Sequence, residues 1–219
     1  MDRTARAKIR DAAIETVAID GPSGVTARKV AAAAGVSPAL LIHHYGSMDS
    51  LREECDHYVA AELRRLKSAA TAQGASLDLL AALRTGHPLP LARYLAAVLT
   101  DDSPAVSRLV DELVADACAY SEQAVGTGML QPSADPQGRA AVLMLWGLGA
   151  LVLHRHMERL LGVDPTNPDF GRTPESVNYL APVYEIYSNG LLAEEFAERA
   201  RDAMAALADG ARSTEEASP

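Results

Sequence analysis

A short joint between two helical segments constrains this chain more than any other feature of its sequence. The segment Ala27–Ala34 follows Thr26, a preferred N-cap residue, and precedes Gly35, which tolerates the left-handed backbone conformation common at helix C-termini. Two residues later, Ser37 can cap the next helix. Such a tight joint sets two helices at a steep angle, which is the helix-turn-helix arrangement.

The second segment begins with Pro38, whose missing N–H is harmless at the first helical position, and it ends near Tyr45. Four apolar residues are spaced to form a small core between the two segments: Val30, Ala34, Val36 and Leu41. The second segment then projects from the surface and can enter a DNA major groove, which is about 12 Å wide. We therefore predict a three-helix DNA-binding domain over residues 1–50.

Helix signals continue along the remainder of the chain, where strand formers are sparse. Further helices are predicted at about Thr4–Ile19, Met48–Ala70, Leu77–Arg84, Leu89–Leu99, Pro104–Val125, Pro136–Leu161 and Pro174–Leu207. A loop is predicted at Gly162–Arg172, and Pro182 is expected to kink or break the last helix. The predicted fold class is all-α, with the helix-turn-helix domain, a larger helical domain over residues 51–210 and a flexible tail over residues 211–219.

Charge is distributed unevenly between the two predicted domains. The chain has a formal net charge of −9, but residues 1–50 have six Lys and Arg against five Asp and Glu, and the remainder has fourteen against twenty-four. A general nucleic-acid coat protein would rarely be this acidic. We expect only the near-neutral N-terminal domain to approach phosphates, so the acidic body must bind something else.

The cysteines and the apolar segments argue against other classes of protein. Cys55 and Cys118 match no zinc-binding spacing, which leaves them as buried apolar residues in a reducing cytoplasm or, alternatively, as a redox-sensing pair. The N-terminal sequence lacks the apolar core of a signal peptide, and the apolar run Ala140–Leu153 is too short to span a bilayer. We therefore expect a cytoplasmic protein.

No catalytic, metal or cofactor site is predicted. His154 and His156 are two residues apart on one predicted helix, so their side chains point roughly 200° apart and cannot chelate one ion together. His87, Glu112 and Asp116 are scattered, and the sequence contains no nucleophile elbow, phosphate-binding glycine loop or HExxH helix. The sequence therefore favours a binding protein over an enzyme.

The N-terminal motifs resemble those of the TetR family of one-component regulators. The matching residues are Thr26, Ala33-Ala34-Gly35-Val36-Ser37, Leu41, His43-His44-Tyr45 and Gly46-Ser47. A weaker likeness over the whole chain, including LREECDHYVAAELR and PVYEIYSNGLL, is to an actinobacterial subgroup often linked with ABC-type efflux transporters. The family often has lysine where this chain has Met48, which removes one expected phosphate contact.

The resemblance implies DNA contacts for ten residues: Thr26, Arg28, Lys29, Ser37, Pro38, Ala39, Leu40, His43, His44 and Tyr45. The helix N-terminus behind Ser37 would bind a phosphate. Because the reading segment lacks Arg, Asn and Gln, base specificity would depend on Arg28, the histidines, apolar contacts and DNA shape. Alternatively, Leu40 and Ile42 are core residues, the histidines are bystanders and Tyr45 packs inward.

The same resemblance implies roles for the larger domain. TetR-like proteins dimerise through their last two long helices, here Pro136–Leu161 and Pro174–Leu207, so the operator is expected to be palindromic. A cavity among the middle helices would hold a hydrophobic or amphipathic small-molecule inducer. The candidate lining residues are Tyr94, Tyr120, Met144, Trp146, Tyr179 and Tyr184. Alternatively, these side chains fill the core and the dimer interface.

The function expected from these observations is that of a ligand-responsive transcriptional repressor, a homodimer that controls an ABC-type efflux transporter operon. Inducer binding would move the long helix Met48–Ala70 like a lever and separate the two DNA-reading helices of the dimer. Three alternatives stay open. They are a ligand-independent DNA-binding regulator, a helical enzyme or small-molecule carrier with a vestigial N-terminal domain, and an activator.

Overall fold

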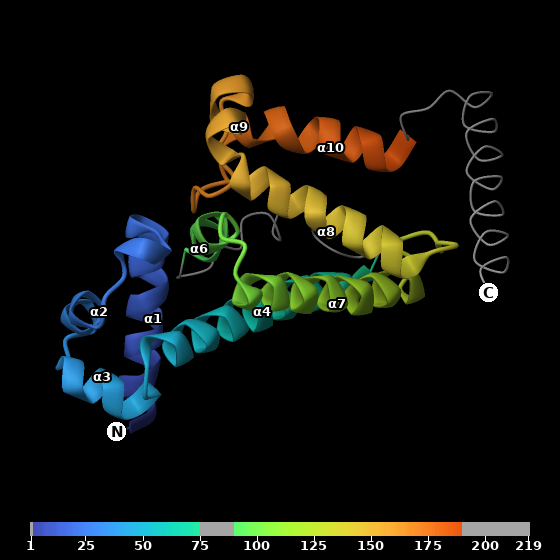
Figure 1. The fold of residues 1–219 in the computed structure, drawn as a ribbon. Coiled ribbons are helices and arrows are strands. Elements are labelled where there is room, and N and C mark those ends of the chain that lie inside the picture. Colours follow the sequence, from blue (N-terminus) through green and yellow to red (C-terminus); the bar gives the residue numbers. More distant parts are fainter. Residues whose placement is uncertain (1, 75–89, 190–219) are drawn as a thin grey trace, which may run out of the picture. The chain divides into compact units, whose positions relative to one another are not determined.

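The structure, a computed structural model, describes residues 2–74 and 90–189, and these residues form helices and connecting segments with no strand among them (Figure 1). The described α-helices are α1 (Asp2–Asp20), α2 (Ala27–Ala34), α3 (Pro38–Tyr45), α4 (Met48–Ala72), α6 (Leu91–Val98), α7 (Pro104–Gly126), α8 (Pro136–Val152), α9 (His154–Leu161) and α10 (Val177–Asn189). Two 3-10 helices are also present, η1 (Pro22–Gly24) and η3 (Pro174–Ser176). The predicted all-α class is confirmed.

The chain divides into two compact units, one ending at Ser176 and one beginning at Val177. The predicted helix Leu77–Arg84, the end of the predicted helix Pro174–Leu207 and the predicted tail lie outside the described residues. The described part of that last helix begins as η3 and continues as α10. Pro182 lies inside α10, and the helix is not broken there.

The head of the protein is formed by α1, α2 and α3 around one shared core. Ile9 of α1, Val30 of α2 and Leu41 of α3 are completely buried in the same apolar cluster. Burial removes the apolar face of each helix from water, and this holds the three helices against one another. Ala34 and Val36, also predicted for this core, are half-buried against the same cluster.

Local hydrogen bonds define the helix ends in the head. Thr26 and Ser37 each accept a hydrogen bond from the backbone N–H three residues later, at 3.3 and 3.1 Å. Gly35 lies between them with φ 68° and ψ 34°, the left-handed conformation expected of a helix C-cap. These predicted caps are confirmed. The predicted cap at Thr4 is wrong, because α1 begins at Asp2 and Thr4 lies inside the helix.

Helix α4 connects the head to the body, by which we mean helices α6 to α9 of the first compact unit. It is one continuous helix of 25 residues, about 37 Å long at 1.5 Å per residue. It lies side by side with α7 (Figure 1). Pairs of ionisable side chains join the two helices: Glu53–Arg108 at 3.5 Å, His57–Glu112 at 3.0 Å and Arg64–Asp116 at 2.9 Å. Such partly exposed pairs contribute little individually, so apolar packing provides most of the attachment and the pairs favour one register.

Helix α6 contacts both α1 of the head and α8 of the body. Its Tyr94 is completely buried, and the phenol donates a hydrogen bond to Oδ1 of Asp56 on α4 at 2.6 Å. Burial raises the pKa of Asp56, although the hydrogen bond from Tyr94 acts to lower it. Because separating the pair would leave a buried polar group without a partner, this contact holds α6 and α4 together.

The predicted single helix Pro136–Leu161 is wrong, because the chain bends by 77° between α8 and α9. Leu153 at the bend has φ −93° and ψ 15°, and neither proline nor glycine marks this position. Beyond the bend, Met157 becomes buried, and Nδ1 of His154 lies 3.3 Å from Oδ1 of Asp164. These contacts attach α9 to the rest of the chain by tertiary packing. The helical pattern of the sequence does not predict such contacts. The predicted loop that follows α9 is confirmed.

Gly35→Ala is expected to destabilise the protein by about 1 kcal/mol, because the left-handed conformation is unfavourable for a residue with a Cβ atom. No neighbouring atom lies within 4 Å of that Cβ position, so backbone strain rather than a clash would cause the loss. Gly126→Ala at the end of α7 is the control and should be neutral or stabilising, since its Cβ also meets open space without a positive φ. Urea unfolding at one fixed protein concentration compares the two, and equal stability would contradict the prediction.

Candidate nucleic-acid interface

The outward face of α3 contains the residues predicted to read DNA. The exposed side chains on or beside this helix are Ser37, Pro38, Ala39, Leu40, Ile42 and His43. Leu40 and Ile42 are 36% and 41% exposed, so they are surface residues rather than the core residues considered as an alternative. The opposite face is buried through Leu41 and Tyr45. One buried face and one open face are what a groove-reading helix requires.

Two adjacent histidines lie in the last turn of α3. The rings of His43 and His44 are 5.7 Å apart in an edge-to-face arrangement. His43 is exposed, whereas His44 is half-buried. A neutral imidazole has one donor and one acceptor nitrogen, so each ring is chemically able to hydrogen-bond a phosphate oxygen or a base edge.

Helix α2 presents three of the predicted contact residues at its start. Thr26, Arg28 and Lys29 are all exposed. Nζ of Lys29 forms an ion pair with Oδ2 of Asp20 at the end of α1, at 2.8 Å. Arg28 forms no ion pair within the part of the chain that the structure describes. Arg28 is therefore the more available cation, because Lys29 would have to share its charge between Asp20 and a phosphate.

The orientation of α3 is held by contacts of Tyr45, which is only 7% exposed. Its hydroxyl donates a hydrogen bond to the backbone oxygen of Arg6 on α1 at 2.8 Å. The Arg6 guanidinium lies 5.0 Å from the centre of the Tyr45 ring and pairs with Oε2 of Glu54 on α4 at 3.0 Å. Burial raises the pKa of Tyr45, so the hydroxyl keeps its proton and remains a donor. In this structure Tyr45 packs inward and joins α3 to α1, and Arg6 connects this contact to Glu54 of α4.

Sequence reasoning identified Tyr45 but missed Arg6 and Glu54. The two charged residues are 48 positions apart, and neither belongs to the helix-turn-helix motif. Opposite charges on two amphipathic helices would suggest such a pair only once the helices are known to be neighbours. Arg6 and Glu54 act on the interface indirectly, by keeping the last turn of α3 in place.

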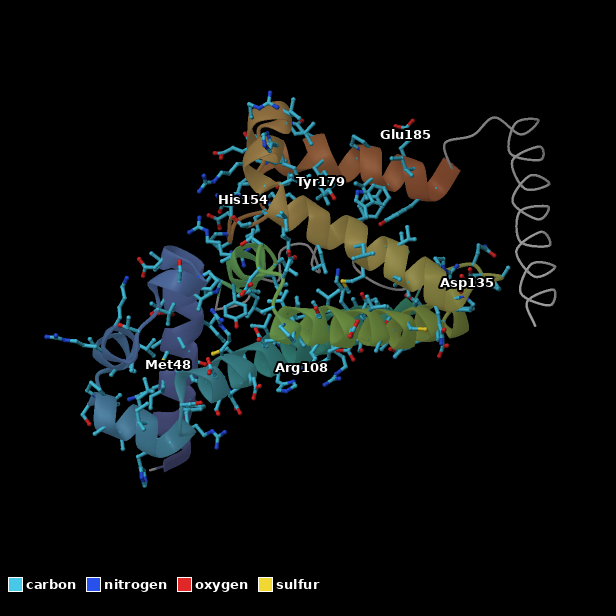
Figure 2. All side chains as sticks on the ribbon, viewed as in Figure 1. Met48, Arg108, Asp135, His154, Tyr179 and Glu185 are labelled. Atoms are coloured by element: carbon cyan, nitrogen blue, oxygen red, sulfur yellow. The ribbon has the colours of Figure 1, made fainter. Side chains whose placement is uncertain are left out.

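The six residues predicted to line a ligand cavity occupy different environments. Tyr94 is completely buried, Met144 packs against the core cluster, and Tyr120 on α7 is half-buried. Trp146 on α8 is 37% exposed. Tyr179 and Tyr184 lie on α10, in the second compact unit; Figure 2 labels Tyr179 on that helix. Of the six, Tyr94 lines a described cavity, which has a volume of about 220 Å³.

Residues 2–74 and 90–189 contain neither a single membrane-spanning helix nor a metal-binding group of side chains. No single described helix is long and apolar enough to cross a membrane, although α8 and α9 together would satisfy length and composition as a sharply bent pair. No group of three or more His, Cys, Asp and Glu side chains in this part of the chain could hold a metal ion.

An all-α protein whose head presents a capped, half-exposed helix in a helix-turn-helix motif has the architecture of a DNA-binding transcriptional regulator. Residues 9–55 match bacterial regulatory proteins of the tetR family, and residues 87–193 match the tetracyclin repressor-like C-terminal domain. The HTH-type transcriptional regulatory protein RaaS of Mycobacterium tuberculosis is 36% identical over 194 residues, covering 88% of this chain and 89% of that protein. The chain belongs to the TetR family of transcriptional regulators.

Solved structures agree with this fold. The crystal structure of a TetR-family transcriptional regulator from Rhodococcus sp. matches with a TM-score of 0.60 and 21% identity, covering 85% of this chain and 100% of that chain. The similarity therefore extends through the N-terminal helix-turn-helix domain and the larger helical C-terminal domain. TetR-family transcriptional regulators bind DNA, act as dimers and are generally not enzymes.

Tyr45→Phe is expected to lower the free energy of unfolding by about 1 kcal/mol, because it removes the hydroxyl that donates to Arg6 and leaves a backbone oxygen without that bond. Tyr184→Phe is the control. Tyr184 is 39% exposed on α10, so loss of its hydroxyl should change stability very little. Chemical denaturation of both variants at equal concentration is the measurement. A Tyr45→Phe variant as stable as the parent would show that this hydrogen bond does not hold α3.

Proposed function

We propose that this TetR-family regulator is a homodimeric, ligand-responsive repressor that binds a palindromic operator with the exposed face of α3. The observation that supports this most strongly is the two-faced burial of that helix. Leu41 and Tyr45 are buried against the rest of the head, while the other residues from Pro38 to His43 are exposed and leave an accessible surface for a DNA groove. In this proposal residues 1–50 form the DNA-binding domain, and residues 51–210 form the ligand-binding and dimerisation domain.

The proposed DNA contacts divide into positioning contacts and base-reading contacts. Thr26, Arg28 and Lys29 at the start of α2, together with Ser37 and the N-terminus of α3, would bind phosphates. Pro38, Ala39, Leu40 and His43 would face the base edges, where apolar side chains can contact thymine methyl groups. His44 would contact the backbone beside them. Tyr45, which is buried, would act by holding α3 in position.

Charge supports an approach of the head alone to DNA. Residues 1–50 have a net charge close to zero, while the remainder is strongly acidic, so the body would be repelled by phosphates. With few cations available, few counterions would be released on binding. We therefore expect a shallower dependence of operator affinity on salt than for strongly basic DNA-binding proteins.

The proposed dimer is supported by an apolar surface on α8. Val142 and Leu145 are 64% and 56% exposed, whereas Ala140 and Leu148 on the same helix are buried. Isolated exposed apolar residues are common, but a continuous run of them along one helix is typical of a surface that a partner covers. A two-fold dimer through α8 would present two copies of α3 to successive turns of DNA.

The proposed ligand response uses α4 as a lever. This helix begins in the head and lies along α7 in the body, so a small rotation at the body end displaces the head. A hydrophobic or amphipathic inducer would favour the conformation in which the two heads no longer match the operator spacing. The likeness to regulators linked with ABC-type efflux transporters supports a transporter operon as the regulated target, and a cytoplasmic site of action follows from this role.

The parent protein is expected to bind a palindrome from its own upstream region more tightly than random DNA. His43→Ala should weaken operator binding about ten-fold or more with little effect on random DNA, because it removes a base-facing contact. Arg28→Ala should weaken both and reduce the slope of log affinity against log salt by about one. Fluorescence anisotropy over a salt series measures both effects.

Arg155→Ala is the matched control, since Arg155 is an exposed cation on α9 outside the head. Its removal should leave operator affinity and salt slope unchanged. Parent protein that binds all sequences equally would refute the proposed operator recognition. If the palindrome binds but no ligand changes its affinity, the ligand-independent regulator is the correct description.

Leu145→Glu is expected to shift the protein from dimer to monomer, because an ionised carboxylate would be placed in an apolar interface. Operator affinity should fall with it, since one head alone provides half of the contacts. Sedimentation equilibrium measures the mass, and Ala119→Glu on the exposed side of α7 is the control. A Leu145→Glu protein that remains dimeric would exclude this surface of α8 from the interface.

A further inference from the structure

A cavity of about 220 Å³ lies where the head meets the body. Its walls come from four elements: Ala13 and Val17 of α1, Val25 after η1, Leu51 and Cys55 of α4, and Tyr94 of α6. Figure 2 labels Met48, another lining residue, at the start of α4 beside the head. We call this space the head–body cavity. None of the other five residues predicted to line an inducer pocket contributes to it.

The size of the head–body cavity limits its occupant. Cavities of about 150 Å³ accept a molecule such as benzene, and pockets for drug-sized ligands begin near about 300 Å³. The head–body cavity falls between these values, so it can hold one ring or a short aliphatic chain with a small polar group. It is too small for the amphipathic inducers expected from the family resemblance.

Of the two charged side chains that line the cavity, Arg52 is the less exposed. Arg52 of α4 lines it, is half-buried, and forms no hydrogen bond or ion pair with any residue in the described ranges 2–74 and 90–189. Its guanidinium has five N–H donors arranged to match a carboxylate. Asp49 also lines the cavity, but it is exposed, so water screens its charge more strongly.

The other polar groups at the cavity are already engaged. The Tyr94 phenol donates to Asp56 at 2.6 Å, so its proton is not available to a ligand. Asp56 is buried behind Tyr94, and the charge of Arg52 acts on it through space. The thiol of Cys55 lies 3.8 Å from the backbone oxygen of Arg10. Arg52 is therefore the group that an incoming acceptor would meet.

We propose that the head–body cavity binds a small monocarboxylate with one ring or a short aliphatic chain. The carboxylate pairs with Arg52, and the apolar part lies between Ala13, Val17 and Leu51. This site is separate from the inducer pocket expected among the middle helices. Because its walls include α1 of the head and α6 of the body, the bound molecule favours one distance between them and so affects DNA binding. Only that last step rests on the proposed repressor function.

The test is calorimetric titration of the full-length protein with sodium benzoate at constant ionic strength. We expect saturable binding of one benzoate per chain. Arg52→Gln should weaken it about ten-fold or more, because a charge-assisted hydrogen bond is lost. Ala13→Met should abolish binding by filling the cavity. Arg93→Gln is the matched control, since it removes an exposed cation from α6 without altering the lining, and it should bind benzoate like the parent.

Benzylamine, a cation with the same ring, should not bind. The proposal fails if millimolar benzoate gives no saturable binding, if Arg52→Gln binds like the parent, or if benzylamine binds equally well. Because Ala13 is almost fully buried, the larger side chain in Ala13→Met could prevent folding, and circular dichroism checks that this variant is folded. If it is not folded, Arg52→Gln alone tests whether benzoate binds in the cavity.

Operator affinity with and without benzoate is compared within each variant. Saturating benzoate should change the affinity of the parent several-fold and leave that of Arg52→Gln unchanged at the same concentration. An unchanged parent affinity would overturn the proposed coupling to DNA. The two proposals fail separately: operator binding without benzoate tests the repressor function, and benzoate binding without DNA tests the cavity.

Discussion

The position of α3 depends on the burial of one of its faces. Leu41 and Tyr45 belong to the core cluster of the head, and the Tyr45 hydroxyl is satisfied by a backbone oxygen of α1. Apolar burial supplies the attraction, and the hydrogen bond favours one orientation, since a buried hydroxyl without a partner is costly. The exposed face, proposed to meet DNA, is therefore oriented by the core. Arg6 and Glu54 strengthen this arrangement from α1 and α4.

The head is also coupled to the body through two helices that are packed differently. Helix α4 is continuous from the head into the body, and its polar pairs with α7 resist sliding. Helix α6 is attached to α4 by the buried hydrogen bond between Tyr94 and Asp56, and it also contacts α1. Close packing does not fill the space between these elements completely, and the head–body cavity remains beside Arg52. A molecule bound there would act on the junction on which the proposed repression depends.

A predicted helix end agrees with the structure where the residues that define that end are close to it in the sequence. Helices α2 and α3 have the predicted bounds because Thr26, Gly35 and Ser37 act within three residues of themselves. Helices α4 and α7 begin at the predicted residues for the same reason. The bend at Leu153 was not predicted, since its stabilising contacts involve residues that follow in the next loop. The sequence leaves the direction of the Tyr45 side chain open, because a sequence pattern does not specify which neighbour a side chain contacts.

By itself, the sequence determined the all-α class, the helix-turn-helix motif and the family, because caps, turns and helical periodicity are local and together specific. Only the tertiary structure decided which residues meet between helices. It placed Arg6 against Tyr45, paired Lys29 with Asp20, buried Tyr94 against Asp56, and left a cavity between head and body. The reason is physical: these contacts depend on the angles and distances at which whole helices pack, which are set by the summed burial of many side chains and not by any one motif.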